Sequence, residues 1–385
     1  MPSTLRIERI TTPAGLDALK DEWQALFARA GSGLPFHTWE WHAAWWSHMT
    51  EASPWVSDEL FVCALRTPQG ELKAVAPLML TRRPAKGPFG FRALDFIGPD
   101  PNITELRGMF ADPAWETRAY AALRTYLAGC ASEWDWIHWR GLREGTPAHA
   151  QLMNLPGSQA HHTTDNWLLP LPATWEQLKS SRPRNLKESL RKCYNSLKRD
   201  GHTFTLRVAS SPQEVAAAVE RFFALHGARA KADVAVTHKD VFAAPQARDF
   251  LDDICQRYAL KGACRVFELI IKDEVVATRI GFLCGDSLYL YYSGYLPEWG
   301  DYSVMTTCVA EAIQYAIAQG WKTVNLSTGT DVSKTRWAPD NVRYGELVEV
   351  ASSLGRRYAY PAYQEVRKMM AQPKLKAVLG RRARK

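Results

Sequence analysis

The side chains most able to do chemistry lie in the C-terminal half of the sequence. His226 is a candidate general base because the pKa of histidine lies near neutral pH, and it can equally be a structural histidine hydrogen-bonded in a cleft. Asp331 is a candidate carboxylate, although a loop aspartate is often a turn residue. Lys334 is a candidate contact for phosphate, and Arg229 can bind a carboxylate or pair with a surface acid. Tyr295 is a candidate acid, although alternating tyrosines are typical of strand packing.

The loop PEWGDYS joins a predicted strand, SLYLYYSGYL, to a predicted helix at 303–319. Such a connection aims free backbone N–H groups and the positive end of the helix dipole at the loop, which favours an anion such as a diphosphate. Gly300 would permit close approach of the backbone to that ligand, whereas Glu298 and Asp301 would oppose a phosphate. The loop is therefore a candidate anion site.

The elements that must position these residues recur in the two halves of the chain. Each half predicts a strand–turn–strand hairpin, then a helix, then an apolar strand. These elements are 60–80, 113–130 and 134–142 in the first half, and 264–284, 303–319 and 323–327 in the second. We expect an α/β (α+β) fold of two similar lobes, whose mixed sheets are covered by helices. The predicted divisions are 1–165 for the N-terminal lobe, 166–202 for a connecting helix, 203–355 for the C-terminal lobe and 356–385 for a basic end segment.

The positive charge of the chain is concentrated in two places. The net charge is +8, yet residues 356–385 carry ten Lys/Arg against one acid and residues 182–199 carry seven against one, so the rest is acidic. In the second segment Ser181 is the predicted N-cap, and Arg191 lies on a basic helix edge that either faces solvent or an anionic substrate. The basic end is either a solubilising terminus or a contact for RNA or an anionic membrane.

Other patterns exclude several classes of protein. The 385 residues lack phosphate-loop, dinucleotide, zinc-protease and hydrolase motifs, and the seven scattered cysteines favour reduced thiols in a cytoplasmic protein. No metal is expected, because the histidines show no metal-ligand spacing. Neither a secretory signal nor a membrane span is expected. The four tryptophans of FHTWEWHAAWW (36–46) predict packing between the lobes rather than a ligand platform.

The ordered set of segments over about 20–350 resembles the GNAT-fold acyltransferases of the cellulose and exopolysaccharide biosynthesis type, which are tandem-GNAT proteins similar to FemAB-type transferases. The segments that carry the resemblance are FHTWEWHAAWW, AVAPLML, DFIGPDPNITELRGMF, RPRNLKESLRKCYNSLKRDGHTF, LHGAR, VVATRIGF, YYSGYLPEWGDYS and VNLSTGTDVSKTRW. In members of this family, the pair that corresponds to Tyr302-Ser303 is followed by Pro-Gly, whereas here it is followed by Val304-Met305. The late strand of the family carries an aspartate where this chain has Asn325.

The resemblance implies that acetyl-CoA or a longer acyl-CoA lies between strands 288–295 and 323–327. Gly300, Tyr302, Ser303, Asn325 and Lys334 would bind this donor. His226, Tyr295 and Asp331 would act in catalysis, with Tyr295 protonating the departing thiolate, and Arg229 and Arg191 would bind the acceptor, a small molecule or glycan. Three functions remain open: an acyl-CoA-dependent N- or O-acyltransferase, an aminoacyl-tRNA-dependent transferase, and a catalytically inactive partner in polysaccharide synthesis.

Overall fold

One mixed sheet of 13 strands runs through both lobes of the protein, whose computed structural model describes residues 5–31, 33–85, 90–100, 102–232, 239–352, 356 and 358–371. The strand order is β1-β2-β3-β4-β6-β13-β7-β12-β11-β10-β9-β8, and β5 pairs with β3. The strands are β1 Arg6–Ile10, β2 Ser57–Arg66, β3 Leu72–Arg83, β4 Phe91–Phe96, β5 Phe110–Ala111, β6 Trp136–Arg143, β7 Gln159–Pro170, β8 Phe204–Ala209, β9 Cys264–Ile271, β10 Glu274–Cys284, β11 Ser287–Tyr295, β12 Thr323–Thr328 and β13 Asp340–Val350.

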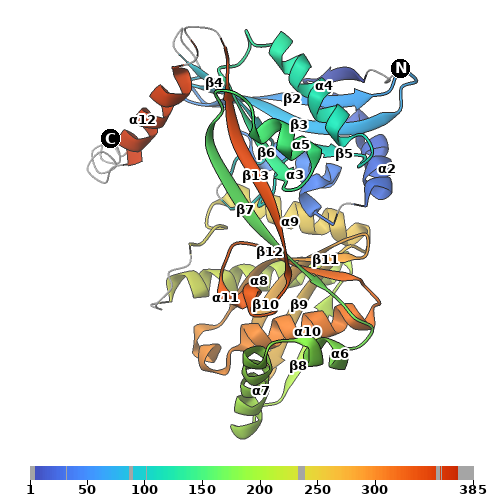
Figure 1. The fold of residues 1–385 in the computed structure, drawn as a ribbon. Coiled ribbons are helices and arrows are strands. Elements are labelled where there is room, and N and C mark those ends of the chain that lie inside the picture. Colours follow the sequence, from blue (N-terminus) through green and yellow to red (C-terminus); the bar gives the residue numbers. More distant parts are fainter. Residues whose placement is uncertain are drawn as a thin grey trace, which may run out of the picture.

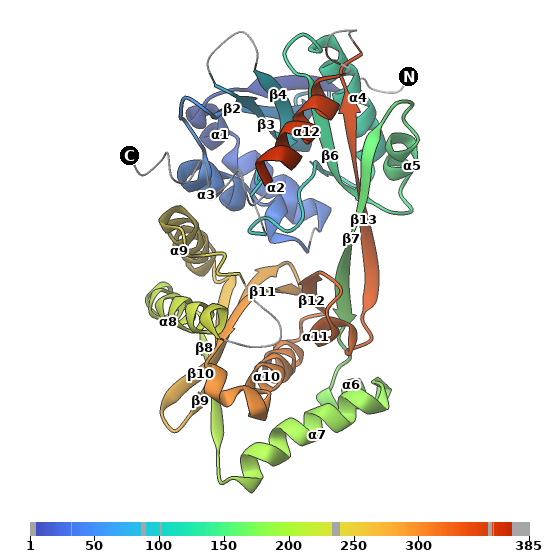
Figure 2. The ribbon, with the colours of Figure 1, turned by 90° about the vertical axis from the view of Figure 1, so that its left-hand side faces the viewer.

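Helices cover the sheet in each lobe, and Figure 2 shows α8 and α10 on opposite faces of the C-terminal strands. The helices are α1 Pro13–Ala18, α2 Lys20–Ala30, α3 Trp39–Met49, α4 Glu116–Gly129, α5 Pro147–Met153, α6 Trp175–Ser181, α7 Arg184–Arg199, α8 Pro212–Lys231, α9 Pro245–Leu260, α10 Val304–Ala318, α11 Val332–Thr335 and α12 Ala359–Ala371, with 3₁₀ turns η1 Pro35–His37 and η2 Pro297–Tyr302. The expected hairpins, helices and apolar strands of both halves are present.

The two lobes share the long antiparallel strands β7 and β13, which extend from one lobe into the other (Figure 1). At one end β13 pairs with β6 of the N-terminal lobe, and at the other end β7 pairs with β12 of the C-terminal lobe. The predicted boundary at residues 165 and 166 lies inside β7. The chain therefore crosses between the lobes within continuous strands.

Each lobe contains one short pairing of parallel strands. In the C-terminal lobe β11 and β12 pair at Ser287 with Thr323, Leu288 with Val324 and Tyr289 with Asn325. Beyond Tyr289, β11 continues to Tyr295 along β10 and leaves β12. The expected opening between these neighbouring strands is therefore present, and we call it the gap.

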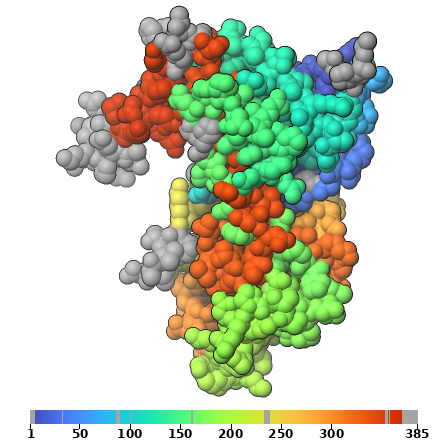
Figure 3. Space-filling view, in the orientation of Figure 1, coloured from blue at the N-terminus to red at the C-terminus, as the bar shows by residue number. Residues whose placement is uncertain are grey.

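The basic helix α7 begins differently from the sequence prediction. Ser181 is the last residue of α6, where its Oγ donates to the carbonyl of Leu178 at 2.9 Å, and Pro183 occupies the N-cap position of α7. Ser181 is therefore not the cap of this helix, because the chain forms a separate helical turn before the proline. Figure 3 shows α6 and α7 as one continuous green surface at the lower end of the molecule.

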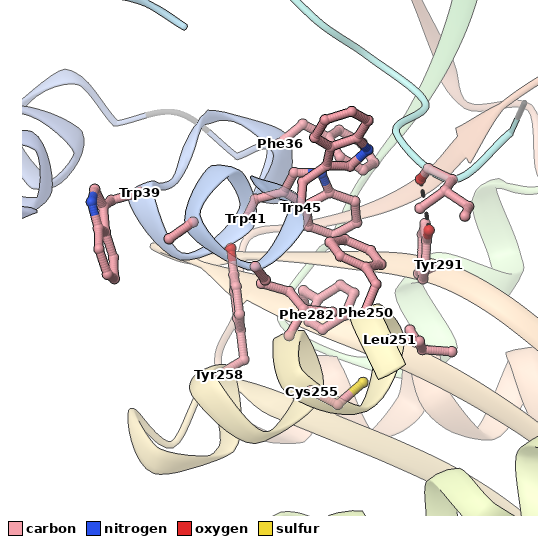
Figure 4. Close-up of a cluster of buried hydrophobic side chains, with 14 of the residues drawn as sticks. Phe36, Trp39, Trp41, Trp45, Phe250, Leu251, Cys255, Tyr258, Phe282 and Tyr291 are labelled. Atoms are coloured by element: carbon pink, nitrogen blue, oxygen red, sulfur yellow. Dashed lines mark hydrogen bonds between the residues drawn. The ribbon is translucent and has the colours of Figure 1, made fainter. Parts of the chain in front are cut away.

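A core of aromatic side chains joins the lobes (Figure 4). Trp41 of α3 meets Phe250 of α9 at a ring distance of 5.1 Å and Tyr291 of β11 at 5.7 Å, both edge to face. Thr38 Oγ1 and the Tyr258 hydroxyl lie 2.9 Å apart and fix the same contact with a hydrogen bond. The prediction that this tryptophan segment packs between the lobes is confirmed.

None of the helices in the described ranges combines the length and the apolar character that a bilayer-spanning segment needs. Residues 372–385, which hold six of the ten Lys/Arg residues of the predicted basic end, lie outside the described residues.

Candidate functional site

A pocket lies at the gap on the side of the sheet covered by α10, and we call it the gap pocket. It encloses about 560 Å³, part of which is open to solvent. Strands β10, β11 and β12, helices α8, α10 and α11, and the two residues after α11 supply its walls. The lining residues are Arg229, Arg279, Leu290, Ser293, Met305, Thr306, Val309, Leu326, Ser333, Lys334, Arg336 and Trp337.

A β-bulge in β11 shapes this pocket. Arg279 pairs with Ser293 and Gly281 with Leu290, so two residues of β11, Tyr291 and Tyr292, stand opposite one residue of β10. The extra residue shifts the alternation of side chains, which places both Leu290 and Ser293 in the pocket wall. Bulges of this kind often re-aim side chains next to functional sites.

Helix α8 packs directly on β11 behind the pocket, and Gly294 permits this contact. A Cβ at Gly294 would lie 2.6 Å from the backbone nitrogen of His226, a distance that real Cβ atoms do not reach. The tight packing brings the guanidinium of Arg229 to the pocket, where it donates to Ser293 Oγ at 3.3 Å. The same guanidinium lies over the Tyr295 ring at 5.3 Å.

Four cationic side chains line the gap pocket, and none of the described residues that line it carries a carboxylate. Lys334 donates to the carbonyl of Thr328 and pairs with Asp331 at 3.1 Å. Arg336 donates to Ser189 Oγ of α7 at 3.2 Å and to Thr306 Oγ1 of α10 at 3.4 Å. The pocket is therefore suited to an anionic ligand.

A carboxylate from the N-terminal lobe enters the gap from the other face of the sheet. Glu105 lies in the loop after β4 and accepts hydrogen bonds from the Tyr289 hydroxyl and from Ser327 Oγ, the latter at 2.9 and 3.0 Å. Burial raises the pKa of Glu105 despite these hydrogen bonds and the charge of Lys334. A carboxyl with a raised pKa is a suitable proton acceptor near neutral pH.

The loop that carries Glu105 is held on β11 by hydroxyl groups. Tyr291 donates to the carbonyl of Ile103 at 2.6 Å, and Tyr292 donates to the carbonyl of Asn102 at 2.5 Å. Together with the bond from Tyr289 to Glu105, these contacts fix the loop at the gap. The tyrosines of SLYLYYSGYL therefore hold the two lobes together as well as packing in the core.

A second cavity lies between the lobes beside Glu105, and we call it the interlobe cleft. It encloses about 940 Å³, including open solvent. Its side chains include three carboxylates and two guanidinium groups, and Arg140 is already paired with Asp95 and Glu346. The lining residues are Asp100, Asn102, Thr104, Glu105, Arg107, Arg140, His162, Thr164, Tyr292, Thr328 and Glu346.

The structure brings some of the predicted residues together at the gap. Arg229 and Lys334 line the gap pocket, Tyr295 lies against Arg229, and Asp331 pairs with Lys334. Burial alone would raise the pKa of Asp331, but the hydrogen bond from Ser333 and the charge of Lys334 outweigh it and lower that pKa. Asp331 is therefore a weaker proton acceptor than Glu105.

His226 lies in an aromatic enclosure behind β11 and lines neither cavity. Its Nδ1–H faces the carbonyl of Ser293 at 3.0 Å, and its ring meets Phe222, Phe242 and Tyr292 at 5.3 to 5.7 Å. Burial lowers the pKa of His226, although its hydrogen bond to Ser293 and the charge of Asp240 favour the protonated form.

The predicted anion loop lies to one side of the gap pocket. Tyr302 donates to Asp200 Oδ2 at 3.1 Å, and Ser303 starts α10 in a left-handed conformation with φ of 53°. Gly300 is exposed within η2. None of the three lines the gap pocket. The first turn of α10 reaches the pocket through Met305 and Thr306 instead.

Two further predicted residues lie apart from the gap pocket. Asn325 lies in another interlobe cavity, where its Oδ1 accepts a hydrogen bond from the backbone of Ser327 at 2.8 Å. Arg191 lies in a groove that α6, α7 and α10 line, beside Tyr194 and Glu311. The structure therefore separates these two residues from Lys334 and Arg229.

Sequence reasoning missed three charged residues at the gap. Glu105 lies in the segment DFIGPDPNITELRGMF, and Arg279 is a charge within the apolar strand VVATRIGF. Arg336 follows Lys334 in the loop that was singled out. A charge inside an apolar strand was the available signal for Arg279, whereas nothing local distinguished Glu105 from the other acids of its loop.

The comparisons with known proteins concern the same region. Residues 184–337 match the family model described as an acetyltransferase (GNAT) domain, and every residue that lines the gap pocket falls within this segment. No curated protein matches the chain. Among solved structures, the crystal structure of FemX is similar with a TM-score of 0.56 and 12% identity, covering 94% of this chain and 99% of that chain.

Two further solved structures show weaker similarity. The tandem GNAT protein from the clavulanic acid biosynthesis pathway has a TM-score of 0.46 and 11% identity, covering 90% of this chain and 99% of that one. L-PGS from Bacillus licheniformis has a TM-score of 0.47 and 11% identity, covering 89% of this chain and 94% of that one.

The fold is therefore a mixed α/β fold of the GNAT-like class, as expected. Within it, the segment from α7 to Trp337 corresponds to a GNAT acetyltransferase domain, which indicates a transferase. The described residues contain no group of three or more His, Cys, Asp or Glu side chains placed to hold a metal ion.

Proposed function

We propose that this protein transfers an acyl group from an acyl-CoA to an amine that lies in the interlobe cleft. The observation that carries the proposal is the position of Glu105 at the gap. The gap pocket lies on one face of the sheet and the interlobe cleft lies on the other face. The carboxylate of Glu105 lies where β11 and β12 separate. A donor in the pocket and an acceptor in the cleft would meet beside this carboxylate.

The reaction follows from these positions. The acceptor nitrogen attacks the thioester carbonyl carbon as its proton passes to Glu105, a C–N bond forms, and the C–S bond breaks. Beyond Tyr289, β11 no longer pairs with β12, and a backbone N–H group of β11 at the gap would polarise the thioester carbonyl. Tyr295, at the end of β11, is placed to return a proton to the departing thiolate.

The charges on the two sides of the sheet support this assignment of substrates. The gap pocket is lined by cations and touches the first turn of α10, which favours the diphosphate of CoA. The interlobe cleft has one more carboxylate than guanidinium groups, which favours an ammonium group over a second anion. An amino sugar, an amino acid or an amine of a polysaccharide precursor fits this requirement.

The basic face of α7 favours a second candidate, transfer from aminoacyl-tRNA. Arg184 is 91% exposed, and Lys187 and Arg191 line a groove beside α10 that is open to solvent. Such a face can follow an RNA backbone near the gap pocket, and this contact would weaken steeply with salt.

The test is release of free thiol from acetyl-, butyryl- and longer acyl-CoA in the presence of a panel of amines, together with thermal shifts on adding each donor. The proposal expects saturable stabilisation by CoA thioesters and thiol release that depends on the amine. Salt-dependent tRNA binding that Arg191→Ala weakens, without any response to CoA, would instead support the second candidate. No response to either donor contradicts both.

A further inference from the structure

Arg279 is a half-buried cation within the stretch VVATRIGF of β10, whose other residues are apolar or neutral. Its Nη2 donates to the carbonyl of Leu290 at 2.9 Å, and its Nε is buried without a hydrogen-bond partner. None of the ion pairs found among the described residues includes Arg279. A guanidinium buried in this way is costly unless a ligand supplies the opposite charge.

The surroundings of Arg279 increase the free-energy cost of holding its charge in the pocket wall. Leu290, Val309 and Leu326 give the pocket apolar walls, and Arg229 lines the same pocket. Burial lowers the pKa of Arg279 and the charge of Arg229 also lowers it, although the charges of Glu105 beyond the gap and of Asp331 act in the opposite sense. An anionic group inside the pocket would offset both the desolvation of the Arg279 guanidinium and its repulsion from Arg229.

The position of the guanidinium indicates which part of the donor it meets. Its hydrogen bond to Leu290 places it one residue beyond Tyr289, at the closed end of the gap. The first turn of α10 and Arg336 lie at the other end, where η2 follows β11. A CoA diphosphate at the α10 end would direct the acyl chain toward Arg279.

We propose that the gap pocket selects an acyl group with a terminal carboxylate, as in succinyl thioesters, and that Arg279 binds this carboxylate. This inference rests on the proposed function and names the class of acyl donor that the same site takes. The carboxylate would accept charge-assisted hydrogen bonds from Arg279, with Arg229 beside it. An uncharged acyl chain would leave the guanidinium buried without an anionic partner.

The test compares succinyl-CoA with butyryl-CoA, which have four-carbon acyl chains that differ in the terminal carboxylate. We expect the wild-type protein to bind succinyl-CoA at least tenfold more tightly by calorimetry, and to release thiol from it faster with the same amine. Arg279→Met should abolish this preference while leaving the affinity for butyryl-CoA unchanged or higher. Arg279→Lys should retain part of the preference for succinyl-CoA.

The matched control is Arg265→Met on the neighbouring strand β9, because the Arg265 guanidinium donates to the carbonyls of Gly262 and Cys264 outside the gap pocket. This variant should keep the full preference for succinyl-CoA. A thermal melt of each variant separates loss of binding from loss of folding, and the wild-type comparison does not depend on any variant.

Three results would overturn the inference, and they differ in what they say of the proposed function. Equal affinity for both thioesters, with thiol release from both, removes the carboxylate preference and leaves the acyltransferase. Equal weakening of free CoA and both thioesters by Arg279→Met would place the diphosphate, not the acyl group, at Arg279. Absence of binding and thiol release with every thioester would reject the inference and the proposed function together.

Discussion

The two lobes contain the same topological feature with different contents. In the N-terminal lobe β4 and β6 pair in parallel at Ala93 with Trp136 and at Leu94 with Ile137, just as β11 and β12 pair briefly in the C-terminal lobe. Beyond the C-terminal pairing there is a pocket lined by cations, whereas beyond the N-terminal pairing the next residues form buried ion pairs. A short parallel pairing is therefore not sufficient to make a binding site.

The N-terminal strands are held by charges that neutralise each other. Asp95 Oδ2 lies 2.6 Å from His138 Nδ1, and Asp95 Oδ1 accepts from Arg140 Nε at 3.0 Å. Arg140 also pairs with Glu346 of β13. Here the carboxylates and cations of neighbouring strands pair with one another, in contrast to Arg279 in the other lobe.

The connection that follows β11 also differs from the connection that follows β4. In the C-terminal lobe η2 leads within a few residues from β11 to α10, so the helix N-terminus stays at the gap. In the N-terminal lobe residues 97–109 separate β4 from β5 and α4, and this longer loop brings Glu105 to the other lobe. One lobe thus supplies the gap pocket and the other supplies the carboxylate.

The strongest test of whether the N-terminal lobe supplies the proton acceptor is the substitution Glu105→Gln. Removing the proton acceptor should lower kcat/KM for acyl transfer by 100-fold or more, within the range typical of general bases. Because burial raises the pKa of Glu105, the wild-type rate should increase with pH as the carboxyl loses its proton and then level off. The variant should lose this rise, which pH-dependent thiol-release kinetics would detect.

Glu116→Gln is the control for that experiment. Burial also raises the pKa of Glu116, but this residue lies at the start of α4 and away from the gap pocket and the interlobe cleft. Its substitution should leave the pH profile unchanged. If Glu105→Gln kept most of the activity with the same profile, the N-terminal lobe would not supply the base.

The contrasting test in the N-terminal lobe is Asp95→Asn. Burial alone would raise the pKa of Asp95, but the charges of Arg140 and His138 outweigh it and hold that pKa well below its usual range. The ionised carboxylate therefore stabilises the fold above the ordinary aspartate pKa, and this stabilisation is lost as the pH falls toward the folded-state value. The substitution should lower the free energy of unfolding by about 3 kcal/mol at pH 7, the usual result of breaking a buried ion pair.

Urea unfolding at pH 7 and at pH 3 would measure the effect, which should be smaller at pH 3 because the carboxyl of the unfolded chain is then largely protonated while the folded one is still ionised. Asp17→Asn, on the exposed surface of α1, is the control and should change stability by less than about 0.5 kcal/mol. CoA binding by folded Asp95→Asn should equal that of the wild type. Weakened binding would mean that the N-terminal ion pairs act on the gap.

The framework could be predicted from local patterns. Alternating apolar strands joined by tight turns predicted both hairpins, and the α10 helix followed from its apolar sequence and from Gly320, which has a positive φ of 74° just beyond the helix. The prediction that Ser181 caps α7 was wrong because serine is suitable both for capping one helix and for ending another. No comparable local pattern predicted the long strands β7 and β13 that the lobes share.

The site was less predictable because its contacts join distant residues. Lys334 was singled out from a polar loop and Arg229 from the segment LHGAR, whereas Glu105 is held by hydrogen bonds from Tyr289 and Ser327, 184 and 222 residues away. Tyr302 stays a predicted contact of the donor, although its hydroxyl bonds to Asp200 at the end of α7 and it does not line the gap pocket. Position in the sheet decides these roles, and residue type alone does not reveal it.

The smallest expected effect separates the gap pocket from the loop η2. Lys334 presents its ammonium to the pocket beside Thr328 and Asp331, so Lys334→Ala should weaken CoA binding five- to tenfold, equivalent to about 1 kcal/mol. Tyr302→Phe removes a hydroxyl that faces Asp200 and should change the affinity by less than twofold. Calorimetric titration with free CoA measures both. A larger loss in Tyr302→Phe than in Lys334→Ala would place the diphosphate on η2, and the cations of the gap pocket would then need another ligand.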